Sequence, residues 1–110
     1  MNTEELYEML QKSQEAKGFL FNADRGLVND LLNSLLINKA RHGYMSCPCR
    51  LATGEREQDK DIICPCEYRD PDVHEYGSCY CALYVSKDWN ERKMETPVVP
   101  ERRPPEKRPF

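Results

Sequence analysis

The sequence has few of the features that would place it in a membrane or on nucleic acid. Its longest apolar run is Cys79–Val85, far short of the ~20 residues that a membrane-spanning helix needs. Basic residues are not in excess: the formal net charge is −3, whereas nucleic-acid-binding domains normally carry a basic surface. The acidic start Met1–Leu6 lacks the apolar segment of a secretory signal and the arginines of a transit peptide. We therefore expect a cytoplasmic protein with no membrane or nucleic-acid partner.

Hydrophobic residues are also scarce. They make up 39% of the 110 residues, with a single tryptophan, while 32% are charged. A chain of this length forms one domain, and this composition gives it a small core. Six cysteines are the compensating feature, because metal or covalent cross-links stabilise chains whose cores are too small. In a reducing compartment, thiols bind metals or do redox chemistry more often than they form structural disulfides.

Two helices are predicted before the first cysteine. Apolar residues at helical spacing predict a helix over residues 3–17, ended by Gly18. A longer helix is predicted from Asn22 or Asp24, both good N-caps, to Arg41. Its wide apolar face should be the main hydrophobic element of the domain: Leu27, Val28, Leu31, Leu32, Leu35 and Leu36.

The character of the chain changes after Tyr44. Segment 53–61 is polar, which predicts a solvated loop or a short exposed helix. Segment 70–72 (Asp-Pro-Asp) signals a turn or a helix start. The apolar segment 79–85 fits either a strand or a buried helix. The short apolar connector 19–21 should lie in the core.

Residues 97–110 hold five of the eight prolines and carry more basic than acidic side chains. Proline lacks the backbone N–H that regular structure needs, so we predict that this segment lies extended along the surface or is disordered. The predicted organisation is a domain of residues 1–96 followed by a charged tail of residues 97–110.

The six cysteines form three C-x-C pairs: Cys47-Pro48-Cys49, Cys64-Pro65-Cys66 and Cys79-Tyr80-Cys81. Residues 50–63 separate the first pair from the second, and residues 67–78 separate the second from the third. Three such pairs in so short a segment indicate that the thiols act together.

Several kinds of site could use these thiols. Zinc sites usually take C-x-x-C knuckles and four ligands. Structural disulfides conflict with the expected reducing compartment, and a disulfide within one C-P-C would be strained. An iron–sulfur cluster takes four thiolates, commonly with proline beside a ligand, and leaves two cysteines for a redox-active disulfide. Four plus two is the simplest allocation. A non-catalytic iron–sulfur electron-transfer protein and a zinc-binding interaction module are the alternatives.

The pattern C-P-C, C-P-C, C-x-C resembles the catalytic (beta) subunit of ferredoxin:thioredoxin reductase. The resemblance continues upstream through Phe21–Asp24 and the long helix leading into Cys47-Pro48-Cys49-Arg50, so that it covers residues 20–86. It implies a small, mainly α domain whose loops fold around one 4Fe–4S cluster.

The resemblance also assigns roles to the six thiols. The ligands of the cluster iron would be Cys47, Cys64, Cys66 and Cys79. Cys49 and Cys81 would form the redox-active disulfide, with Cys49 as the nucleophile and Cys81 facing the cluster. A cation beside a thiol favours the thiolate, and Arg50 directly follows Cys49.

Two features depart from the family pattern. The family's spacer is usually longer between the first two pairs and shorter between the last two, which suggests remodelled loops around an intact site. The third pair usually reads C-H-C, with the histidine assisting proton handling, but Tyr80 stands there. Tyrosine donates a hydrogen bond but ordinarily titrates near ~10, so His74 is a second candidate for proton handling. These departures place the chain among divergent archaeal or anaerobic bacterial relatives.

The implied function is that of an oxidoreductase. Electrons would pass one at a time from ferredoxin, or a similar donor, through the cluster to the Cys49–Cys81 disulfide, which would then reduce thioredoxin- or glutaredoxin-like proteins. A second, non-catalytic subunit is a further expected partner. Ferredoxins are usually acidic, so the donor would need a basic docking patch, for which the candidates are Arg41, Arg50, Arg102, Arg103, Lys107 and Arg108.

Overall fold

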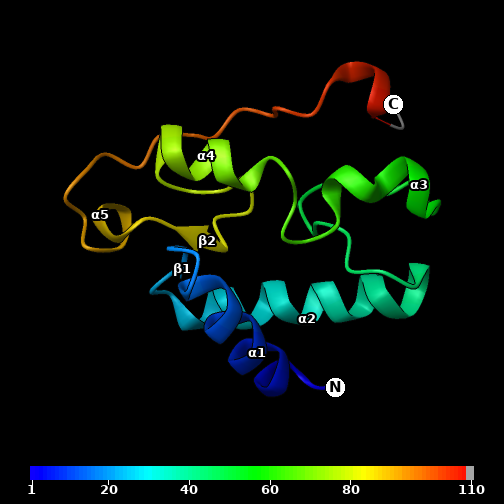
Figure 1. The fold of residues 1–110 in the computed structure, drawn as a ribbon, viewed down its shortest axis with the longest axis horizontal. Helices are drawn as coiled ribbons and strands as arrows, with labels where there is room; N and C mark the ends of the chain where they lie inside the picture. Colours follow the sequence, from blue (N-terminus) through cyan, green and yellow to red (C-terminus); the bar gives the residue numbers. More distant parts are fainter. Residues whose placement is uncertain (109–110) are drawn as a thin grey trace.

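The computed structural model describes residues 1–108, so the last two residues of the predicted tail lie outside the described residues. A long helix, α2, spans one side of the molecule, with α1 packed across it (Figure 1). The cysteine-bearing loops and the short helix α4 lie on the opposite side, and the C-terminal segment passes over them toward α3 (Figure 1). No helix in residues 1–108 is both long and apolar enough to cross a bilayer.

The two predicted helices are confirmed, and side-chain caps fix where they begin. Helix α1 (Thr3–Glu15) starts after Asn2, whose side chain accepts a hydrogen bond from the Glu5 N–H at 2.9 Å. Helix α2 (Arg25–His42) starts after Asp24, which caps it in the same way. Gly43 ends α2 in the left-handed conformation, with φ of 88°.

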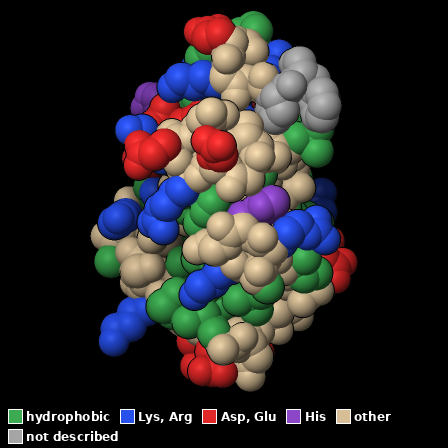
Figure 2. Space-filling view, turned by 90° about the vertical axis from the view of Figure 1, so that its right-hand side faces the viewer, with side chains coloured by type: hydrophobic (Ala, Val, Ile, Leu, Met, Phe, Trp, Pro, Cys, Tyr) green, Lys and Arg blue, Asp and Glu red, His purple; other side chains and the backbone are tan. Residues whose placement is uncertain are grey.

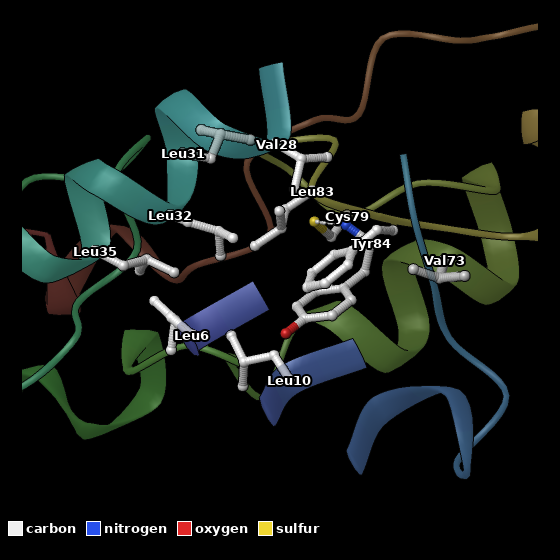
Figure 3. Packing of buried hydrophobic residues seen from close by; sticks show 11 residues of the cluster. Leu6, Leu10, Val28, Leu31, Leu32, Leu35, Val73, Cys79, Leu83 and Tyr84 are labelled. Carbon is white, nitrogen blue, oxygen red and sulfur yellow. Dashed lines mark hydrogen bonds between the residues drawn. The ribbon is translucent and has the colours of Figure 1, made fainter. Parts of the chain in front are cut away.

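The apolar core lies where α1 crosses α2 and continues toward the third cysteine pair (Figure 3). Leu6 and Leu10 of α1 share one cluster of buried side chains with four residues of α2: Val28, Leu31, Leu32 and Leu35. The prediction that Leu27 belongs to this buried face is wrong: it is 36% exposed. It lies in the first turn of α2 and borders a surface cavity with Trp89 instead of facing α1.

A two-stranded antiparallel sheet joins the helical half to the cysteine-bearing half. Strand β1 (Leu20–Phe21) pairs with strand β2 (Tyr84–Val85). Of the segment 79–85, which composition left open between strand and helix, only Tyr84–Val85 forms a strand, and a turn precedes it. The rings of Phe21 and Tyr84 stack with centroids 5.4 Å apart, which extends the core from α1 and α2 to the loop that carries the third cysteine pair.

The remaining elements are short, and charged side chains are buried beside them. They are α3 (Arg56–Asp59), a 3₁₀ turn η1 (Lys60–Ile62), α4 (Arg69–Tyr76), α5 (Lys87–Asn90) and a 3₁₀ turn η2 (Pro105–Lys107). The predicted helix start at 70–72 is thus confirmed within α4. Segment 53–61 does contain a short helix, but it is not fully solvated, since Asp59 is 0% and Asp61 3% exposed.

The C-terminal segment is extended, as its prolines predict, and it is anchored by ion pairs. Arg103 is 1% exposed and donates from Nε to Asp61 Oδ2 at 2.9 Å. Arg102 pairs with Asp72 at 2.7 Å and with Glu75 at 2.6 Å. Buried carboxylates without a cation are strongly destabilising, so these arginines determine where the segment lies.

The pKa of each buried aspartate in this network lies below its ordinary value. Burial alone would raise the pKa of Asp61, but hydrogen bonds from Tyr68 and Arg103 outweigh it and hold the pKa below its ordinary value. Asp59 behaves alike: burial opposes ionisation, while hydrogen bonds from Tyr44 and Thr53 lower its pKa overall.

Charged and apolar side chains share the face that includes the C-terminal end of α2. Acidic and basic side chains are both spread over it, and hydrophobic side chains gather in the half where α1 and α2 lie (Figure 2). Two arginines proposed as a docking patch for an acidic donor are not free on any face, because Arg50 is 8% and Arg103 1% exposed. That part of the patch prediction is wrong, since both guanidiniums compensate buried or partly buried carboxylates.

Replacing Arg103 by methionine should destabilise the protein by about 3–5 kcal/mol, because Asp59 and Asp61 would be left buried without their cation. Urea unfolding followed by circular dichroism measures this change. Lys107→Ala, on the same segment but exposed, should stay within about 0.5 kcal/mol of the parent. Equal losses in both variants would contradict the buried network.

Stability should also fall in acid. A carboxylate whose pKa is lower in the folded state stabilises the fold above its unfolded pKa of ~3.9, and that contribution is lost as the pH falls through the folded value. The free energy of unfolding should therefore be nearly constant from about pH 7 to pH 5 and drop steeply below about pH 4. Unchanged stability between pH 5 and pH 3 would show that Asp59 and Asp61 are not held ionised.

Candidate functional site

Backbone hydrogen bonds bring the first two cysteine pairs side by side. The Cys47 N–H donates to the Ile62 carbonyl and the Cys64 N–H donates to the Met45 carbonyl, both at 2.7 Å. An isolated bridge between Ser46 and Ile63 lies between these two bonds. The loops that precede each C-P-C therefore run antiparallel, and their thiols enter the same region.

Tight turns then separate the two thiols of a pair. In the first pair the Arg50 N–H donates to the Cys47 carbonyl at 3.2 Å, which closes a turn with Pro48 in the second position, where its fixed φ suits the turn. In the third pair the Ala82 N–H donates to the Cys79 carbonyl at 2.9 Å. Each turn carries a cysteine at its start and another two residues on.

The four cysteines predicted to be ligands line one small cavity of about 20 Å³. They are Cys47, Cys64, Cys66 and Cys79. Cys81 lines the same cavity. Cys49 does not lie among the lining residues and is exposed. The structure therefore brings five of the six thiols together and leaves the predicted nucleophile at the surface.

The surroundings of the predicted ligands suit sulfur atoms that carry negative charge. The Arg50 Nη1 donates to Cys66 Sγ at 3.6 Å and to Cys47 Sγ at 3.8 Å. The Tyr84 backbone N–H donates to Cys79 Sγ at 3.4 Å. Burial raises the pKa of the Cys79 thiol to about 11, so this sulfur holds its proton unless a cation takes the proton's place.

This donor set fits an iron–sulfur cluster. Four thiols with N–H donors directed at three of them are the ligands and surroundings that such clusters use. In the described residues 1–108, no three histidine, cysteine or acidic side chains converge closely enough to hold a single metal ion. A four-iron cluster takes one thiolate at each iron, so its ligands need not converge on one point.

The two cysteines predicted to form a disulfide lie next to each other, but Cys81 has a second neighbour that spacing did not predict. All six cysteines are free thiols here. The sulfur atoms of Cys47 and Cys81 lie 2.8 Å apart, and the Cys49 thiol is near enough to Cys81 to affect its pKa. These contacts raise the pKa of Cys81, and the Cys81 thiol lowers the pKa of both neighbours, that of Cys47 to about 7.

Of the two candidates for proton handling, only Tyr80 lies at this site. Tyr80 lines the cysteine cavity, and the Arg50 guanidinium carbon lies 4.5 Å from the centre of its ring. His74 is exposed on α4 and borders a separate surface cavity with Asp70 and Glu75. The structure does not bring His74 to the thiols.

Sequence reasoning did not find the second arginine of the site. Arg69, the first residue of α4, is 5% exposed and lines the cysteine cavity. Its Nη1 donates to Gln14 Oε1 of α1 at 2.5 Å, and its guanidinium lies over the Phe19 ring at 3.8 Å. No local pattern marks the contacts of Arg69 with Gln14 and Phe19, which lie 50 or more residues away, so its place in the site could be found only from the fold.

One comparison with known proteins identifies a family for this chain. The family model described as ferredoxin thioredoxin reductase catalytic beta chain matches residues 1–103. The match is longer than the resemblance over residues 20–86, and it includes α1 and the first half of the C-terminal segment. A comparison with curated proteins gave no match. Since the family model covers nearly the whole chain, the protein belongs to the ferredoxin thioredoxin reductase catalytic beta chain family.

Proposed function

We propose that the protein is a ferredoxin-dependent disulfide reductase that acts on thioredoxin- or glutaredoxin-like proteins. Cys47, Cys64, Cys66 and Cys79 would hold one 4Fe–4S cluster, and Cys49 and Cys81 would form the redox-active disulfide. The observation that carries the proposal is the arrangement of the thiols: the four ligands and Cys81 line one cavity, while Cys49 is exposed. A ferredoxin-like donor and a non-catalytic second subunit would be its further partners.

The bound cluster would supply electrons one at a time, which reconciles a one-electron donor with the two-electron reduction of a disulfide. The chain itself would supply the thiols. With Cys49 and Cys81 both reduced, the Cys49 thiolate attacks one sulfur of the target disulfide. A mixed disulfide forms between Cys49 and the target, and the other target sulfur leaves as a thiolate. The lowered pKa of Cys49, caused first by the neighbouring Cys81 thiol, favours the attacking thiolate.

Cys81 would complete the reaction. Its thiolate attacks the Cys49 sulfur of the mixed disulfide, the second target thiolate leaves, and the Cys49–Cys81 disulfide forms again. The target gains two electrons, and the cysteine pair loses two, so a new cycle needs two electrons from the donor. The raised pKa of Cys81 means that its sulfur keeps its proton until this second step. Tyr80, beside Cys81 in the cavity wall, would hold a hydrogen-bond donor there.

The roles of the two redox thiols can be separated from those of the ligands by single substitutions. Cys49→Ser and Cys81→Ser should keep iron and sulfide, because neither is a ligand in this proposal. Both should lose disulfide reduction by several orders of magnitude, since each removes a covalent step. The measurement is anaerobic reduction of a thioredoxin by chemically reduced ferredoxin, with iron and sulfide analysis of each protein.

Cys64→Ser is the matched control, because Cys64 also lines the cavity but is assigned as a ligand. It should lower the iron and sulfide content and change the visible spectrum. If Cys49→Ser and Cys81→Ser still reduced thioredoxin, the protein would be an electron-transfer protein instead of a reductase. Zinc in place of iron and sulfide in the parent protein would remove the proposal altogether.

A further inference from the structure

Arg50 is the side chain that connects the cysteine cavity to the C-terminal segment. Its side chain is 2% exposed, and its guanidinium carbon lies 4.5 Å from the Tyr80 ring centre and 5.2 Å from that of Tyr68. Its Nη1 is the donor to the sulfur atoms of Cys47 and Cys66. The N–H groups of a guanidinium lie in one rigid plane. A partner that fixes the N–H groups on one edge of the plane therefore also fixes where the N–H groups on the other edge point.

Glu101 fixes the opposite edge of that plane. The Arg50 Nε–H donates to both carboxylate oxygens, each at 3.0 Å, and Nη2 lies 2.9 Å from Oε1 without hydrogen-bond geometry. Hydrogen bonds between charged partners are roughly twice as strong as neutral ones, so this pair holds the Nε edge of the guanidinium against Glu101. With Nε and Nη2 facing Glu101, Nη1 is left to face the two sulfur atoms.

The position of Glu101 is fixed on its C-terminal side. The next two residues, Arg102 and Arg103, pair with Asp72 and with Asp61. The Arg103 backbone N–H also donates to Glu101 Oε1 at 2.8 Å. A change of the Glu101 side chain should therefore leave the segment docked and affect mainly the guanidinium of Arg50.

We infer that Glu101 is a positioning residue, which holds Arg50 as a hydrogen-bond donor to the sulfur atoms of Cys47 and Cys66 and thereby raises the reduction potential of the group that these sulfurs bind. The inference rests on the proposed function, in which that group is a 4Fe–4S cluster. Donors to cluster sulfurs stabilise the additional negative charge of the reduced state, and such bonds are one of the main determinants of potential.

Whether the reduction potential rises or falls when Glu101 is removed distinguishes a positioning role from a direct electrostatic effect of its charge. Removing a carboxylate near a redox group should by itself raise the potential, because one negative charge fewer opposes the added electron. If Glu101 acts by holding Arg50, its removal should lower the potential instead. We expect Glu101→Ala to make one-electron reduction about tenfold less favourable, a fall of ~59 mV.

The experiment is a double-mutant cycle on the midpoint potential of the full-length, cluster-loaded protein, measured by spectroelectrochemical titration. It compares the parent, Glu101→Ala, Arg50→Gln and the double variant. Glu101→Ala should lower the potential when Arg50 is present, and leave it unchanged or raise it when Arg50 is replaced. Glu101→Asp, which keeps the carboxylate, should recover part of the parent value. If Arg50→Gln does not retain the cluster, Arg50→Lys takes its place in the cycle.

Glu106→Ala is the matched control, because it removes the same charge from an exposed position of the same segment. It should leave the potential at the parent value. Additive effects in the cycle, or an equal fall in Glu106→Ala, would overturn the role of Glu101. Iron and sulfide analysis precedes each titration: a parent protein without them refutes the proposed function, whereas an additive cycle in loaded protein refutes only this inference.

Discussion

Two buried aspartates between the first and second cysteine pairs, Asp59 and Asp61, determine how the second half of this chain is arranged. Both are almost fully removed from water, so the fold must bring a cation to them. Arg103 is that cation, and it comes from a segment whose described part, residues 97–108, has one 3₁₀ turn and no other helix or strand. Because the ion pair fixes Arg103, it also fixes Glu101 two residues earlier, and Glu101 in turn holds the guanidinium of Arg50 against the cysteine cavity.

The apolar half of the molecule places the third cysteine pair by different means. The pairing of β1 with β2 joins the connector after α1 to the residues that follow Cys81. Leu83 and Tyr84 enter the same core as the leucines of α1 and α2 (Figure 3), and the Tyr84 N–H donates to Cys79 Sγ. Hydrophobic burial therefore fixes one side of the cavity, whereas ion pairs fix the other. This division suits a chain with a small apolar fraction.

How far the sequence could predict this arrangement depends on the range of each interaction. The two helices were predictable because caps and hydrophobic periodicity are local signals, and both are confirmed to within a few residues. The gathering of the thiols was predictable because three C-x-C pairs repeat. Two other features were not predictable: the burial of Asp61 with its partner Arg103, and the contact of Arg69 with Gln14. In each pair the partners are far apart in the sequence, and no repeating pattern of residues connects them. The sequence of a polar loop whose carboxylates are buried does not differ from that of a loop exposed to solvent.

The first cysteine pair differs from the other two in a way that spacing alone does not explain. Both thiols of the second and third pairs line the cavity, but in the first pair only Cys47 does, and Cys49 is exposed. The turn through Pro48 does not by itself cause this difference, because Cys81 holds the same position in the turn of the third pair. A buried thiol and an exposed thiol two residues apart are what a route from an interior redox centre to another protein requires. Arg50, directly after the turn, contacts the interior sulfur with one edge and the C-terminal segment with the other. The interior end of the proposed route and the segment that supports it are therefore joined by one side chain.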